Sequence, residues 1–274
     1  MSLQSSLLVR FLRESPFQPA TDLWRSIEIA YVANRGLPGG RGLDVGCGDG
    51  HLMAILLEAV GQKPELVGVD IDPKEVARAR QFGIYSDIHV ASADSIPEQV
   101  ASFDWAFSNS VLEHVQPIEG TLAEVARLLR PGAPFILTAP SSEFHACLRG
   151  PIRGSRANYL AAVDRRCAHL RYWTDEEWRA ALGRNGFDLE TCEGFLSVAE
   201  VRRWETISRL TAGVLYRLSG RQPIQIQRGL GMRRGQRLPR FIASVAARFI
   251  DTKRRSVSNG PSGCRYIVGR RRPG

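Results

Sequence analysis

Cysteine is scarce in this 274-residue chain, and long apolar runs are missing from it. No stretch approaches the roughly 18 apolar residues of a membrane-spanning helix, and the N-terminus lacks the apolar run of a secretion signal. The cysteines are odd in number and form no C-x-x-C pair, which argues against a disulfide framework and against a zinc site. We therefore expect a reducing, cytoplasmic environment and no bound metal. The cysteines are Cys47, Cys147, Cys167, Cys192 and Cys264.

Lysine is also rare, since it supplies three of the 37 basic residues. We interpret this arginine excess as the coding bias of a GC-rich bacterial genome and not as chemistry. The charge is unevenly placed: residues 1–194 hold 19 Lys and Arg against 25 Asp and Glu, whereas residues 195–274 hold 18 against 3. The positive charge therefore belongs to the C-terminal part of the chain.

The most informative stretch is a glycine-rich turn, RGLDVGCGDGHL, at residues 41–52. Apolar residues before the turn predict a short buried strand, and a helix is expected to begin near His51. Gly46 and Gly48 allow a sharp turn and leave no Cβ between the main chain and a ligand, while Gly50 allows close approach of the helix. The turn is built to hold a nucleotide-like cofactor.

The glycine spacing discriminates between two such cofactors. A dinucleotide turn has G-x-G-x-x-G, with the pyrophosphate at the helix N-terminus, whereas this chain has G-x-G-x-G. Asp44, two residues before the first glycine, would repel a pyrophosphate but can receive the ammonium group of a methionine moiety. We therefore expect S-adenosyl-L-methionine (SAM) to bind here, along Asp44, Gly46, Cys47 and Gly48.

A second predicted strand, Leu66 to Val69, is closed by Asp70. An acid at this place accepts hydrogen bonds from both ribose hydroxyls of a bound nucleotide. Ile71 is then expected to lie against the adenine face. Simple capping of the next helix is the alternative role for Asp70.

The stretch FDWAFSNSVLEHV, residues 103–115, carries the third motif. It predicts a strand over 103–107 and a turn containing Ser108 and Asn109, where open α/β sheets bind ligands. Glu113 and His114 are expected on the opening turn of the next helix, and the fourth motif, LRPG, precedes a buried strand. In this order the motifs resemble the ubiquinone/menaquinone-type branch of the class I SAM-dependent methyltransferases, over residues 21–194.

The resemblance implies an α/β, Rossmann-like fold. Its sheet has seven strands, mostly parallel with the seventh antiparallel, and helices on both faces; here a helical insertion precedes the last strand. Many members carry an Asp for the adenine amino group where this chain has Ser92. Asp94, or backbone atoms near Ala93, are expected to make that contact instead.

The expected domain organisation has four segments. They are an N-terminal helical lid (1–36), a SAM-binding core (37–194), a basic helical insertion (195–262) and the last core strand with a basic tail (263–274). In the lid, Thr21 or Asp22 is expected to cap a helix that carries Trp24 and Arg25. By analogy with the family these two line the cofactor site; packing of Trp24 on the core and solvation of Arg25 is the alternative.

Residues 195–262 have apolar residues at helical spacing, around Trp204 and Phe241, with arginines on other faces. Three roles stay open for this insertion: docking on the sheet or on a second subunit of a homodimer, lying on the inner membrane, or tracking nucleic acid phosphates. Sparse aromatic residues, and SNSV in place of an Asn/Asp-Pro-Pro-aromatic motif, count against nucleic acid.

The polar connection over 141–171 is expected to form the acceptor pocket.

Methyl transfer from a sulfonium is an in-line displacement, in which positioning supplies most of the acceleration. A base is needed only for a hydroxyl acceptor, and the imidazoles of His114, His145 and His169 are the candidates, each of which also fits a structural role. We predict methylation of a small-molecule, glycan or lipid-linked acceptor at oxygen. A SAM-binding scaffold without catalysis, or an RNA methyltransferase, are the alternatives.

Overall fold

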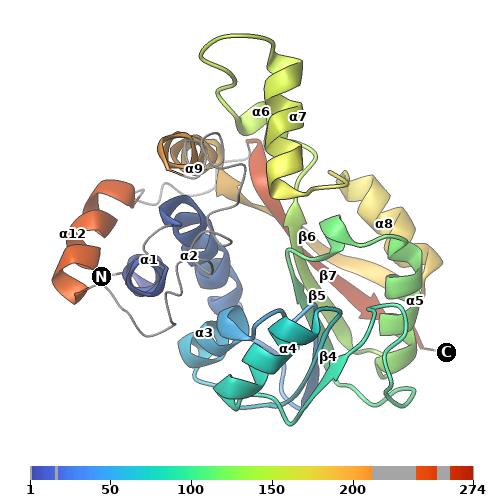
Figure 1. The fold of residues 1–274 in the computed structure, drawn as a ribbon. Coiled ribbons are helices and arrows are strands. Elements are labelled where there is room, and N and C mark those ends of the chain that lie inside the picture. The colour runs from blue at the N-terminus through green and yellow to red at the C-terminus, as the bar shows by residue number, and fades with distance from the viewer. Residues whose placement is uncertain (1, 16–17, 212–238, 252–259, 274) are drawn as a thin grey trace. The chain divides into compact units, whose positions relative to one another are not determined.

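The structure is a computed structural model that describes residues 2–15, 18–211, 239–251 and 260–273 (Figure 1). The chain divides into two compact units. The helical unit comprises Met1–Tyr31, Glu143–Cys167 and Phe195–Gly263, and the sheet unit comprises Val32–Ser142, Ala168–Gly194 and Cys264–Gly274. The four predicted segments are not tested by this division and stay a prediction.

The sheet has seven strands in the order β3-β2-β1-β4-β5-β7-β6, which confirms the predicted fold class. β1 pairs in parallel with β2 and β4, and β7 runs antiparallel to β5. The strands are β1 (Arg41–Val45), β2 (Glu65–Asp70), β3 (Asp87–Val90), β4 (Trp105–Asn109), β5 (Pro134–Pro140), β6 (Phe187–Ser197) and β7 (Ser262–Arg271). Because the first five are parallel, their carboxyl ends share one edge, where ligands of open α/β sheets bind.

Helices cover both faces of this sheet. Figure 1 shows α3 and α4 on one side and α5 and α8 on the other. Alternate strand residues explain the arrangement, since Leu43 and Val45 join the core under α5 and α8 while Asp44 points to the opposite face. The helices are α3 (His51–Val60), α4 (Pro73–Ala79), α5 (Ile118–Leu128) and α8 (Asp175–Arg184), with short 3-10 turns η1 (Arg80–Phe82) and η2 (Leu112–His114).

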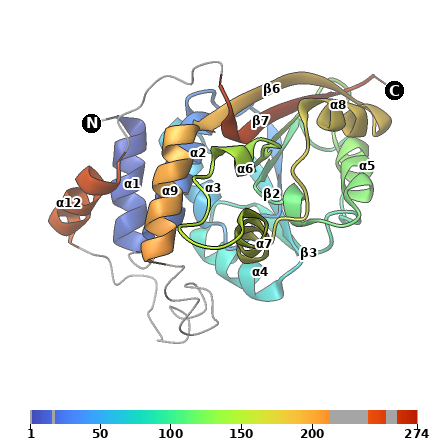
Figure 2. The same cartoon turned by 90° about the horizontal axis from the view of Figure 1, so that it is seen from above.

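The helical unit contains α1 (Leu3–Glu14), most of α2 (Pro19–Ala33), α6 (Phe144–Cys147), α7 (Arg156–Cys167), α9 (Val198–Leu210) and α12 (Arg240–Ile250). α12 packs on α1, and the two lie side by side in Figure 2. Across the ranges that the structure describes, no helix is both long and apolar enough to cross a lipid bilayer.

Two local predictions were confirmed: α3 begins at His51, and α9 and α12 are the described helices of the predicted insertion. On α8, Thr174 and Glu177 form a capping box. The remaining positions of the insertion's helical pattern, among them Val214, Leu218 and Leu238, lie outside the described residues.

Three local predictions were wrong. α2 already begins at Pro19, whose fixed φ suits a first turn, so Thr21 and Asp22 lie inside the helix and do not cap it. β4 extends through Asn109, which places Ser108 in the strand, and His114 lies on η2 instead of the opening turn of α5. The connection over 141–171 contains the helices α6 and α7, and its part in an acceptor pocket stays a prediction.

Candidate active site

The glycine turn folds back on the end of β2. The backbone N–H groups of Gly46 and Cys47 both donate to the Val69 carbonyl, each at 2.9 Å. Gly46 has φ +75°, and a Cβ there would lie 2.5 Å from the Val111 side chain, so the position needs glycine for both conformation and space. Gly48 has φ +54° with open space where its Cβ would be. The turn therefore leaves a backbone cradle beside Gly48.

Asp70 at the end of β2 is held in a fixed orientation. One carboxylate oxygen accepts the Gly48 N–H at 2.8 Å and the other accepts the Asp72 N–H at 2.9 Å. A carboxylate has about four acceptor sites, so two backbone donors leave capacity for further hydrogen bonds. Ile71 beside it is 73% exposed, although large apolar side chains are usually buried. This pair presents an acceptor and an apolar surface side by side.

Asp44 is buried on β1, and its carboxylate accepts a 2.6 Å hydrogen bond from the Tyr85 hydroxyl. Burial raises the pKa of Asp44 to about 7, although the Tyr85 hydrogen bond lowers it; the negative charge of Asp70 adds a smaller upward effect. Burial also raises the pKa of Tyr85 well above its ordinary value. The arrangement favours a cation near Asp44, because a positive charge would offset the cost of ionising it.

The structure brings two of the three candidate histidines together, at the carboxyl end of β4. The rings of His114 and His169 lie 5.5 Å apart, and the buried carboxylate of Glu113 lies 3.9 Å from His114 Nε2. One backbone hydrogen bond and two from a side chain hold the two segments on each other. The Leu170 N–H donates to the Glu113 carbonyl at 3.0 Å, and Arg171 donates to two carbonyls on either side of it, those of Leu112 and Val115.

Comparisons with known proteins agree with this geometry. The family model described as a methyltransferase domain matches residues 24–191. The chain belongs to the class I SAM-dependent methyltransferases. A ubiquinone biosynthesis O-methyltransferase of Aromatoleum aromaticum is 35% identical over 140 residues, which are 49% of this chain and 58% of that protein.

One further relative and one solved structure of similar fold cover more of this methyltransferase. A ubiquinone biosynthesis O-methyltransferase of Xylella fastidiosa is 28% identical over 68% of this chain and 75% of its own length. The solved structure of a geranyl diphosphate methyltransferase in complex with SAM has a TM-score of 0.54 at 14% identity, with 92% of this chain and 88% of that chain covered. The chain spans about half the length of several curated relatives it matches, for example 58% and 48%.

The cofactor of this class is SAM, and the donor set of the methyltransferase fits it. Asp70 offers a fixed acceptor for ribose hydroxyls, Ile71 an exposed apolar face, and the Gly48 turn an open cradle. The buried amide nitrogen of Asn109 has no hydrogen-bond partner among the described residues, although its oxygen accepts from Thr138 at 3.3 Å. An unsatisfied donor at the ligand edge of the sheet suits a polar ligand.

The other predicted cofactor residues of the methyltransferase have mixed environments. The Ser108 hydroxyl is buried and donates to the Val45 carbonyl at 3.1 Å, so it joins β4 to β1. Ser92 and Asp94 are exposed and Ala93 is half-buried on the loop after β3. Their contact with adenine stays a prediction.

Trp24 and Arg25 belong to the helical unit of the methyltransferase. The Trp24 ring makes edge contacts with Phe144 and Trp204, with centroids 5.7 and 5.5 Å apart. Arg25 pairs at 2.5 Å with Glu28, which is fully buried. These contacts give both residues a structural role within their unit, and their predicted cofactor role stays a prediction.

His145 also belongs to the helical unit. Its Nε2 lies 2.8 Å from the carboxylate of Asp164, which joins α6 to α7. The structure therefore separates the three predicted bases by unit, with His145 in one and the pair His114 and His169 in the other.

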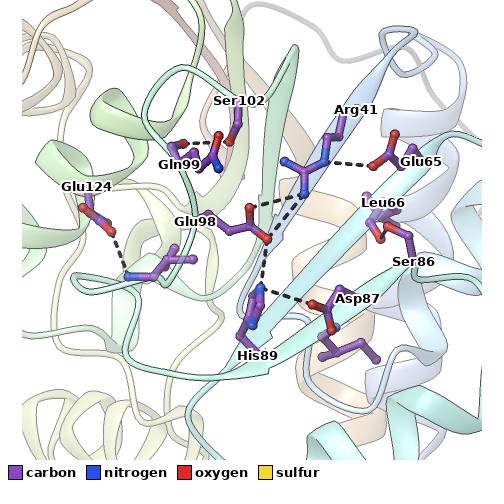
Figure 3. Close-up of polar contacts among 12 residues, drawn as sticks. Arg41, Glu65, Leu66, Ser86, Asp87, His89, Glu98, Gln99, Ser102 and Glu124 are labelled. Atoms are coloured by element: carbon purple, nitrogen blue, oxygen red, sulfur yellow. Dashed lines mark hydrogen bonds and ion pairs between the residues drawn. The ribbon is translucent and has the colours of Figure 1, made fainter.

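A second polar cluster lies at the opposite edge of the sheet. Arg41, at the start of β1, reaches Glu65 at 3.0 Å and Glu98 at 3.3 Å, and Glu98 also contacts His89 at 2.9 Å (Figure 3). Asp87 lies 3.8 Å from the same imidazole. Because this edge carries the amino ends of the strands, the cluster fits a stabilising role better than ligand binding.

Two site residues were not predicted as such from the sequence. Tyr85 lies 41 residues after Asp44, and no local pattern marks the contact between them. Glu113 contributed to the family resemblance, but its burial beside two imidazoles depends on the distant loop at His169. The LEH motif could have identified Glu113 from the sequence, whereas no sequence pattern identifies Tyr85.

Proposed function

We propose that this enzyme transfers the methyl group of SAM to a hydroxyl oxygen of a small-molecule, glycan or lipid-linked acceptor. The observation that carries the proposal is the group of Glu113, His114 and His169 at the same sheet edge and in the same unit as Asp70. A hydroxyl must lose its proton to become a good nucleophile, and this group contains imidazoles suited to that purpose. Curated relatives named as O-methyltransferases support the oxygen assignment.

The hydrogen bonds of His114 support its part in the proton transfer. Its Nδ1 lies 2.7 Å from the Ala168 carbonyl, which can only accept a hydrogen bond, so Nδ1 carries the proton. In the neutral imidazole the lone pair is then on Nε2, the nitrogen directed toward Glu113. The proton of an acceptor hydroxyl is released at this cluster.

The remaining residues bind and orient. Asp70 holds the ribose hydroxyls, Asp44 receives the ammonium group, and Ile71 covers the adenine. Bound SAM supplies an activated methyl group, so alignment of acceptor and methyl gives most of the rate acceleration. The balance of the reaction is simple: an O–C bond forms, the S–C bond breaks, its electron pair stays on sulfur, and the hydroxyl proton leaves to solvent.

The proposal is tested by methyl transfer from methyl-labelled SAM to a panel of phenols, sugars and glycolipids, with products identified by mass spectrometry. We expect an O-methylated product from at least one hydroxyl class, and little from matched amines. SAM binding without transfer to any member of the panel would instead support the non-catalytic scaffold. Preferred methylation of the amines would contradict the oxygen assignment.

We further propose that α12 contacts an anionic membrane surface, which suits a lipid-linked acceptor. Phe241 and Phe249 are 78% and 73% exposed, and Ile242 and Val245 are also exposed, while the small residues of the helix pack inward. α12 carries basic side chains but no acidic one. An exposed apolar face beside arginines is the pattern of helices that lie in the interface of anionic bilayers.

Vesicle co-sedimentation tests this contact. We expect binding to vesicles of phosphatidylcholine with phosphatidylglycerol, weaker binding to phosphatidylcholine alone, and loss of binding in a Phe241→Ser/Phe249→Ser variant. Leu210→Ser is the matched control, because Leu210 is 72% exposed on α9. Equal binding by wild type and double variant would overturn the proposal, as would a homodimer in solution that the double variant abolishes.

A further inference from the structure

We propose that Tyr85 is a positioning residue for the cofactor, because its hydroxyl holds one oxygen of the buried Asp44 carboxylate and leaves the other for the ammonium group of SAM. The hydroxyl donates to Asp44 Oδ2 at 2.6 Å, and Asp44 Oδ1 accepts no hydrogen bond from any residue that the structure describes. The inference rests on the part given to Asp44 in the proposed function. Its test needs only cofactor analogues and no methyl acceptor.

The ring of Tyr85 is held from both edges. A Cβ on Gly68 of β2 would lie 3.0 Å from Cε1 of the ring, and a Cβ on Gly50 would lie 3.2 Å from its Cε2. These two glycines therefore leave the space that the ring occupies, between β2 and the start of α3. Because the ring is fixed on these sides, the position of its hydroxyl oxygen is fixed as well. The ring also packs on a small apolar cluster, which consists of Cys47, Val76, Ala79 and Ile88.

No cation accompanies the Asp44 carboxylate within the described parts of the chain. The titratable groups that act on it are the Tyr85 hydroxyl, the Cys47 thiol and the Asp70 carboxylate. Burial raises the pKa of the hydroxyl and that of the thiol above their ordinary values, so both stay neutral, and Asp70 adds a negative charge. A buried carboxylate without a cation is costly to ionise. The missing positive charge fits the ammonium group of a ligand.

The Tyr85 hydroxyl supports the charged form of Asp44. Tyr85 keeps its proton and donates it, and a donated hydrogen bond favours a carboxylate over a carboxylic acid. Without the hydroxyl, burial would act on Asp44 unopposed, so fewer molecules would carry the charge near neutral pH. Tyr85 therefore has two effects on cofactor binding: it fixes the direction of the carboxylate, and it widens the pH range over which the carboxylate is charged.

The test is calorimetric titration of Tyr85→Phe, which keeps the ring and removes only the hydroxyl. One ligand is S-adenosylhomocysteine, which keeps the ammonium group, and the other is 5′-methylthioadenosine, which lacks the amino acid part. We expect S-adenosylhomocysteine to bind about tenfold more weakly than to wild type at about pH 6, with a smaller difference at about pH 9, where Asp44 ionises in both proteins. The affinity for 5′-methylthioadenosine should not change.

Two further variants separate positioning from packing. Ser86→Ala is the matched control, because it removes a hydroxyl from the neighbouring residue, whose contact is with the Leu66 carbonyl at 3.0 Å. It should bind both ligands like wild type. On an Asp44→Asn background, Tyr85→Phe should cause no further loss of affinity, since Tyr85 acts on the ammonium group through Asp44. The ammonium group of the ligand also titrates, so the proteins are compared at each pH.

Three results would overturn the inference: an unchanged affinity for S-adenosylhomocysteine in Tyr85→Phe, an equal loss of affinity for both ligands, or a further loss on the Asp44→Asn background. Each of them would leave the proposed methyl transfer in place. Absence of S-adenosylhomocysteine binding to wild type would overturn both the inference and the proposed function. The expected loss of affinity, together with no methyl transfer to any acceptor, would support the inference and remove the proposed function.

Discussion

The Tyr85 hydroxyl donates a 2.6 Å hydrogen bond to the buried carboxylate of Asp44 and so joins the segment before β3 to the strand that leads into the glycine turn. The carboxylate is almost excluded from solvent, and its pKa is raised to about 7 by burial. Its charge therefore changes within the physiological pH range, next to the turn expected to bind the amino acid part of the cofactor.

Stability should depend on pH through Asp44. Its pKa in the folded state, about 7, lies above the value of about 3.9 expected in the unfolded chain, so between these values the native state binds more protons. The contribution of Asp44 to stability is complete below about pH 4 and is lost as the pH rises toward 7. Relative to Asp44→Asn, the wild type should lose up to about 4 kcal/mol of unfolding free energy over that range, measured by chemical denaturation.

A Tyr85→Phe variant checks the cause of that effect. Removal of the hydroxyl takes away the hydrogen bond that favours the ionised carboxylate, so the loss of stability should extend to higher pH. A difference between wild type and Asp44→Asn that does not change with pH would contradict the assignment of a raised pKa.

Cofactor affinity should depend on the same ionisation. If Asp44 receives the ammonium group of SAM, binding requires its charged form, whose population falls about tenfold from pH 8 to pH 6. Calorimetric titrations should show a corresponding loss of affinity in wild type and a weak, nearly pH-independent affinity in Asp44→Asn. An equal pH dependence in both proteins would place the ammonium group elsewhere.

The two glycines of the turn should respond differently to substitution. In Gly46→Ala the new Cβ would lie 2.5 Å from the Val111 side chain at a positive φ, so we expect a loss of about 1–3 kcal/mol in stability. In Gly48→Ala the Cβ would enter open space, so we expect a smaller loss of stability and a larger loss of SAM affinity. Val111→Ala should partly restore the stability of Gly46→Ala, and failure to do so would point to the backbone strain as the whole cause.

Much of the fold could be predicted because its signals are local. The glycine turn and the acid that closes β2 each depend on residues a few positions apart, so their spacing in the sequence reports their structure. The predicted start of α2 was wrong for a related reason. Thr21 and Asp22 are good capping residues, but Pro19 is an equally good first residue, and local preference does not rank the two.

The parts of the site that depend on distant contacts could not be predicted. Tyr85 meets Asp44 across 41 residues, and Leu170 meets Glu113 across a connection in which α6 and α7 intervene. No helix was predicted in that polar connection, whereas His145 and Asp164 pair between two helices there. Polar residues on exposed helix faces and in loops look alike in composition, and the tertiary contact decides between them.

The most direct test of the account is calorimetric titration of the wild-type protein with SAM and S-adenosylhomocysteine, repeated on Asp70→Ala. Asp72→Ser is the matched control, because it retains an oxygen to cap α4 and lies two residues away. The account predicts binding of both ligands to wild type and control, and a loss of at least about tenfold in affinity for Asp70→Ala, since the ribose hydroxyls lose a charged acceptor. Absence of binding to the wild type, or equal affinity in Asp70→Ala, would contradict it.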